Sequence, residues 1–70
     1  MNQPLNHREL ANNLEKLTNP YIQDLLEVLG LLPTASRAEG VDKVKAFAKE
    51  QPGAFLERVA GSGYDDLLLD

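Results

Sequence analysis

Apolar residues recur every three or four positions along most of the chain, which is the pattern of amphipathic helices. One narrow apolar stripe predicts a helix over about 7–18, and a wider one predicts a second helix over about 20–29. Two further stripes predict helices over about 37–50 and 53–60. The stripes consist of Leu10, Leu14 and Leu17; Ile22, Leu25, Leu26 and Leu29, flanked by Tyr21 and Val28; Val41, Val44, Phe47 and Ala48; and Phe55, Leu56, Val59 and Ala60. The pattern predicts a small all-α bundle of about four helices.

Capping residues support these boundaries. Asn6 and Ser36 each precede a glutamate by three positions, the spacing of a capping box at a helix start. The Asn19-Pro20 pair predicts that the second helix opens with Asn19 as its N-cap. Gly30 is expected to stop that helix in a left-handed conformation, with Leu31 folding back on Leu26.

Gly40 lies inside the first turn of the third predicted helix. A glycine in a helix interior costs about 1 kcal/mol relative to alanine. The sequence therefore predicts either a helix that begins later, at Val41, or a gain of up to about 1 kcal/mol in stability from Gly40→Ala.

The last nine residues stand apart, so we divide the chain into a helical domain, 1–61, and an acidic, leucine-rich tail or short helix, 62–70. Two interpretations are open. The leucines close the core of the bundle, in a fifth helix opened by Ser62 with Asp65 as its capping partner, or they form a motif that docks on another protein. In the second case the partner-binding residues are Tyr64, Asp65, Asp66, Leu67, Leu68 and Leu69.

The chain has 70 residues, of which 43% are hydrophobic and none is cysteine. This length allows one core, and the lack of cysteine excludes disulfides and thiolate metal sites. Together with the lack of an export signal or a membrane-spanning run, it predicts a cytoplasmic protein without membrane contact. The chain has one histidine, His7, so we expect no metal site.

The sequence also offers few candidate catalytic residues. His7 has no nucleophile near it in the sequence, and the acidic pairs are typical of a solvated helix face. Gly61 and Gly63 lack the lysine and hydroxyl residue that would follow in a phosphate-binding loop. We therefore expect no enzyme activity, no cofactor and no small-molecule substrate.

The net charge of −4 argues against a dedicated nucleic-acid-binding protein, which needs excess positive charge on one face. Only the stretch 36–50 is locally positive, with four basic residues against three acidic ones. Its basic residues are Arg37, Lys43, Lys45 and Lys49.

Residues 21–48 nevertheless resemble the SAP-type helix-extended-helix DNA-binding motif. The resemblance lies in Gly30-Leu31, in Pro33-Thr34 and in the helix start Arg37-Ala38-Glu39. Gly40 departs from it, because such motifs carry a core leucine there, and so does an extra residue near Leu32. The resemblance implies that Arg37, Lys43 and Lys45 contact phosphates, with Lys49 on the same basic helix.

The function that the sequence favours is a small non-enzymatic protein-protein interaction or assembly module, acting as an adaptor, regulator or structural subunit. It would bind another protein, or a second copy of itself, through apolar helix surface and the tail. The alternative is nucleic-acid binding through the basic third helix.

Overall fold

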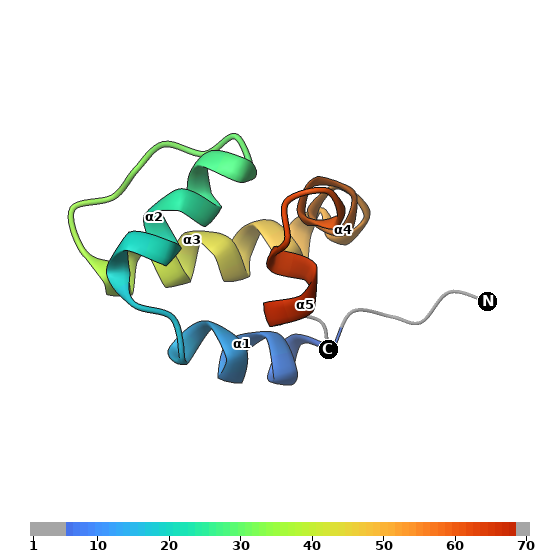
Figure 1. Ribbon diagram of the computed structural model, residues 1–70, viewed down its shortest axis with the longest axis horizontal. Helices are drawn as coiled ribbons and strands as arrows, with labels where there is room; N and C mark the ends of the chain where they lie inside the picture. Colours follow the sequence, from blue (N-terminus) through green and yellow to red (C-terminus); the bar gives the residue numbers. More distant parts are fainter. Residues whose placement is uncertain (1–5, 69–70) are drawn as a thin grey trace.

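The computed structural model describes residues 6–68, which form helices joined by turns and one longer loop, with no strand in that range (Figure 1). Its helices are α1 (His7–Glu15), α2 (Asn19–Val28), α3 (Arg37–Glu50), α4 (Pro52–Ala60) and α5 (Tyr64–Leu68). α3 contacts α1, α2 and α4, and α5 packs against α1 and α4. The all-α prediction is confirmed, and the predicted tail forms a fifth helix over the part that is described.

α1 begins as predicted and ends earlier. The Asn6 side chain accepts a hydrogen bond from the Glu9 backbone N–H at 3.1 Å, which caps the first turn. At the other end, the N–H groups of Lys16 and Leu17 each donate to a carbonyl three residues back, at 3.1 Å. These shorter turns tighten the chain, so the helix ends at Glu15 and not near residue 18.

The predicted cap of α2 is wrong by one residue. Thr18 is the N-cap, and its carbonyl accepts from the Tyr21 and Ile22 N–H groups at 3.1 Å. Asn19 is already helical, and its side-chain oxygen accepts from Gln23 Nε2 at 3.1 Å. The helix therefore begins with a proline in its first turn and without a side-chain cap.

The end of α2 confirms the predicted glycine stop. Gly30 has a φ of 78°, which favours glycine. The Leu31 N–H donates to the Leu26 carbonyl at 2.8 Å, and the Gly30 N–H donates to the Glu27 carbonyl at 3.0 Å. This pair of bonds is the Schellman arrangement, and it turns the chain into the loop 29–36.

The predicted late start of the third helix at Val41 is wrong, and the packing around Gly40 argues against a gain in stability from Gly40→Ala. Ser36 accepts from the Glu39 N–H at 3.2 Å, so α3 is capped as predicted and runs through Gly40 from Arg37. Gly40 is buried against α2, where a Cβ atom would lie 2.6 Å from Ile22 Cγ2 and 3.1 Å from Thr34 Oγ1. Gly40 thus allows two helices to approach closely, a packing role that helix propensity does not show.

α4 starts at Pro52, one residue before the predicted start, because Gln51 leaves helical geometry with a ψ of 66°. α5 follows Gly63, whose φ is 90°. Ser62 Oγ accepts from the Tyr64 N–H at 3.2 Å and donates to the Val59 carbonyl at 2.8 Å. Ser62 therefore opens α5 through Tyr64 and not through a capping partner at Asp65.

The core is apolar and draws on all five helices. Its buried members are Leu10, Leu14, Ile22, Leu25, Leu26, Leu29, Val41, Val44, Ala48, Phe55, Val59, Tyr64 and Leu68. Within residues 6–68, no helix has the length and apolar character needed to cross a membrane.

Candidate functional site

The outer side of α2 meets α5 at a shallow hollow of about 240 Å³. Its lining consists of Tyr21 and Asp24 from α2, Ser62 and Gly63 from the preceding turn, and Tyr64 and Leu67 from α5. Tyr21 is 54% exposed and Leu67 is 52% exposed. Two large apolar side chains therefore stand in solvent on either side of one depression.

Tyr64 fixes the floor of this hollow. Its ring is buried, and its hydroxyl donates to Asp24 Oδ2 at 2.7 Å while also lying 3.3 Å from the Tyr21 carbonyl oxygen. Burial, and then the hydrogen bond and negative charge of Asp24, raise the pKa of Tyr64 to about 12. The hydroxyl is thus a permanent donor near neutral pH, and it ties α5 to α2.

A second hollow, of about 550 Å³, lies between α2 and the loop 29–36. It shares Asp24 with the first, and its other lining residues are Pro20, Gln23, Glu27, Leu31 and Pro33. Gln23 holds the loop in place, since its Nε2 donates to Thr34 Oγ1 at 2.9 Å and its Oε1 accepts from the Thr34 N–H at 2.9 Å. We call the two hollows and the side chains between them the α2 surface.

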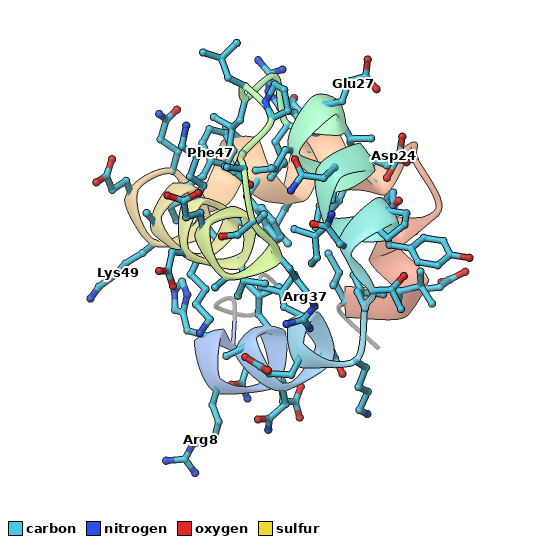
Figure 2. The ribbon with its side chains drawn as sticks, turned by 90° about the vertical axis from the view of Figure 1, so that its left-hand side faces the viewer. Arg8, Asp24, Glu27, Arg37, Phe47 and Lys49 are labelled. Carbon is cyan, nitrogen blue, oxygen red and sulfur yellow. The ribbon has the colours of Figure 1, made fainter. Side chains whose placement is uncertain are left out.

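The α2 surface is acidic. Asp24 and Glu27 of α2 are exposed and line its hollows, and in the sequence of α5 the acidic residues Asp65 and Asp66 come directly before Leu67. No lysine, arginine or histidine occurs in 17–36 or in 59–68. Figure 2 shows Asp24 and Glu27 on one side of the molecule, with Phe47 and Lys49 on the other.

The structure separates the tail residues proposed for partner binding. Tyr64 and Leu68 are buried in the core of the chain, at 7% and 1% exposure. Asp65 is half-buried, Asp66 and Leu67 are exposed, and Leu69 lies outside the described residues. Within 62–68, Leu67 is therefore the large apolar side chain that faces solvent. Tyr64 and Leu68 close the core of the bundle instead, as one of the two interpretations of the tail predicted.

Tyr21 was not among the proposed site residues, although it belongs to the apolar flank of the second predicted helix. Of the two tyrosines, Tyr64 of α5 is buried against α2 and Tyr21 stays exposed, a packing outcome across 43 residues of sequence. The signal available in the sequence was an aromatic residue beside an already complete apolar stripe.

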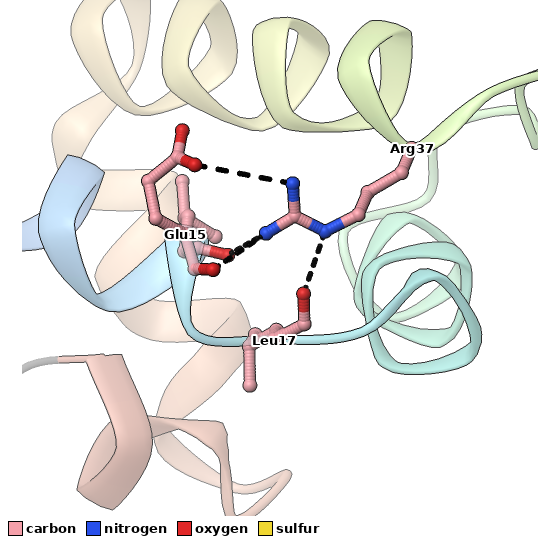
Figure 3. A network of polar contacts seen from close by, with 4 residues as sticks. Glu15, Leu17 and Arg37 are labelled. Atoms are coloured by element: carbon pink, nitrogen blue, oxygen red, sulfur yellow. Dashed lines mark hydrogen bonds and ion pairs between the residues drawn. The ribbon is translucent and has the colours of Figure 1, made fainter.

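The basic residues proposed for phosphate contact are also separated. Arg37 serves α1 instead: its Nε donates to the Leu17 carbonyl at 2.7 Å, and its Nη2 donates to the Leu14 and Glu15 carbonyls at 3.0 and 2.8 Å (Figure 3). Its Nη1 lies 4.0 Å from the Glu15 carboxylate. Arg37 thus satisfies the open carbonyl end of α1.

The α3 lysines remain on the surface, with Lys43 and Lys49 exposed and Lys45 half-buried. Lys43 borders a third hollow, of about 410 Å³, together with Glu39 and Asp42. Two carboxylates therefore accompany this lysine, which lowers the local positive potential.

The described part of the chain has few clusters of the side chains that bind metals or act in catalysis. His7 is exposed, and residues 6–68 hold no group of three or more metal-ligating side chains. Comparisons of the chain with protein-family models, with curated proteins and with solved structures give no match.

Proposed function

We propose that the protein is a docking module that binds another protein through the α2 surface. The observation that carries this proposal is the placement of exposed apolar side chains. Among residues 6–68 the large exposed apolar residues are Tyr21, Leu32 and Leu67, and two of these three flank one hollow. Single exposed apolar residues are ordinary, so the proposal depends on the grouping of two of them at one depression.

The size and chemistry of the hollow fit a partner side chain. Its volume of about 240 Å³ is below the range of about 300–1,000 Å³ for ligand pockets. Tyrosine is enriched at binding hot spots, where a rigid ring buries a large area at a low entropic cost. An apolar side chain seated between Tyr21 and Leu67 would cover both of them, while the Tyr64 hydroxyl stays satisfied by Asp24.

The test is capture from extract of the source cells by the tagged full chain, compared among variants. We expect nuclease-resistant capture of a protein by the wild type and by Leu32→Ser, and its loss in the double variant Tyr21→Ser/Leu67→Ser. Leu32 is a matched control because it is 75% exposed and lines neither hollow of the α2 surface. Thermal melting by circular dichroism checks that each variant is folded.

Two results would contradict this proposal. The first is equal capture by the double variant and the control. The second is that no protein is captured more by the wild type and Leu32→Ser than by the double variant, although all variants remain folded.

A second candidate is nucleic-acid binding through α3, favoured by the exposure of Lys43 and Lys49. It makes a different prediction in the same experiment. Nucleic acid would be recovered, its binding would fall steeply with salt, and Lys43→Ala/Lys49→Ala would abolish it while Tyr21→Ser/Leu67→Ser would not.

A further inference from the structure

We infer that the α2 surface takes a cationic amphipathic helix of another protein. This inference rests on the proposed docking function and names the class of partner. The evidence is the combination of exposed apolar side chains with carboxylates that have no basic neighbour on the same elements.

Two carboxylates of α2 line the hollows of this surface. Asp24 and Glu27 are three residues apart on α2, so they lie on the same side of that helix. Asp24 lines both hollows, and Glu27 lines the second. Asp65 and Asp66 lie beside Leu67 on α5. The stretch 17–36 contains no basic residue. Arg58 of α4 lies near Gly30, beyond the C-terminal end of α2, and lines neither hollow.

A helix fits this surface better than an extended peptide. An extended strand gains affinity by pairing with an open sheet edge, and residues 6–68 form no strand. Recognition here depends on side chains, as when an amphipathic helix lies in a groove. One apolar residue of the partner would fill the hollow between Tyr21 and Leu67, and lysine or arginine one turn away would face Asp24 and Glu27.

Charge argues against the other occupants. A second copy would bring its own net charge of −4, and on α3 its Lys43 lies beside Glu39 and Asp42. A nucleic acid or an anionic membrane would be repelled by the carboxylates that line the surface. A basic partner gains attraction at the same place, which raises the association rate and rejects acidic partners.

The test uses two synthetic amphipathic peptides that share one leucine stripe, with lysine at every polar position in one and glutamate in the other. Each is titrated into the isotopically labelled full chain, and backbone amide shifts report the site and the affinity. We expect the lysine peptide to shift amides around Tyr21 and Leu67 and to bind about tenfold or more tightly than the glutamate peptide.

A matched pair of charge variants locates the effect. Glu27 and Glu50 are both exposed, and Glu50 lies at the end of α3. Glu27→Gln should weaken binding of the lysine peptide by about threefold, whereas Glu50→Gln, with the same change in net charge, should leave it unchanged. Equal weakening by both variants would mean that only the overall charge matters and would overturn the inference.

The remaining outcomes separate the inference from the proposed function. Equal affinity of both peptides at Tyr21 and Leu67 overturns the charge selection and leaves apolar docking in place. If neither peptide binds, or if the amide shifts are confined to other surfaces, the inference is overturned. The capture experiment then decides whether the docking function holds. Loss of both results would overturn both proposals.

Discussion

At Gly40, the lack of a side chain determines how closely α3 approaches α2. Gly40→Ala should destabilise the protein by about 1–3 kcal/mol, because its Cβ would lie 2.6 Å from Ile22 Cγ2 in a packed interior. Gly53 of α4 is the control, since a Cβ there meets nothing within 4 Å. Gly53→Ala should be neutral or add up to about 1 kcal/mol. Urea unfolding of both variants measures the difference, and a stabilised Gly40→Ala would contradict the packing argument.

The Tyr64 hydroxyl links α5 to α2 and makes stability depend on pH at the alkaline end. Its pKa is about 12 in the folded protein against 10.0 for a free tyrosine, so the folded state holds this proton more tightly than the unfolded state. The stabilisation is fully present below pH 10 and is lost as the pH rises from 10 to 12.

Tyr64→Phe isolates this effect. It keeps the ring and removes the hydroxyl, and it should cost about 1 kcal/mol near neutral pH. Urea unfolding across the range from pH 10 to 12 should show the wild type losing its advantage over the variant. An advantage that stays constant over this range would show that the Tyr64 hydroxyl does not titrate as argued.

The residues that the sequence predicts well are those whose partners are near in the chain. The caps at Asn6 and Ser36 and the stop at Gly30 each depend on hydrogen bonds spanning five residues or fewer. Arg37 bonds carbonyls 20 or more residues away, and Tyr64 bonds Asp24 across 40 residues. Sequence periodicity carries no information on such contacts, so it does not show that Arg37 caps α1, and the SAP resemblance implies a phosphate contact for it instead.

Among the elements, α5 shows how two adjacent leucines differ in role. Leu68 is 1% exposed and its carbonyl accepts from Asn13 Nδ2 at 2.8 Å, whereas Leu67 is 52% exposed. Leu68→Ala should cost about 2–5 kcal/mol and Leu67→Ala less than about 1 kcal/mol. Thermal or urea unfolding measures both. Similar costs for the two variants would mean that α5 is not seated on α1 and α4 as described.

The candidate docking surface could be anticipated only in part. Periodicity predicted the ends of four helices to within three residues, and the composition of the tail drew attention to Leu67. Which leucine faces the core depends on the rotation of a five-residue helix, and that rotation is set by Gly63 and by the fit of Tyr64 against α2. Helical periodicity over so few positions does not fix the rotation.

At the scale of the whole molecule, the core does not divide at residue 61 into an independent domain and a separate tail. Tyr64 and Leu68 belong to the same buried cluster as residues from α1 to α4. A chain of 70 residues has little stability to lose, because small domains bury a low fraction of their surface. Removing two core side chains should therefore affect every helix.

Truncation after Gly61 should abolish cooperative thermal unfolding, with a broad transition and reduced helical circular dichroism. The full-length double variant Leu67→Ser/Asp66→Asn is the control, because both side chains are exposed, and it should melt cooperatively near the wild-type temperature. A truncated chain that melts as sharply as the full chain would establish 1–61 as an independent domain. α5 would then be free to leave α2, and the hollow between Tyr21 and Leu67 would exist only while α5 is docked.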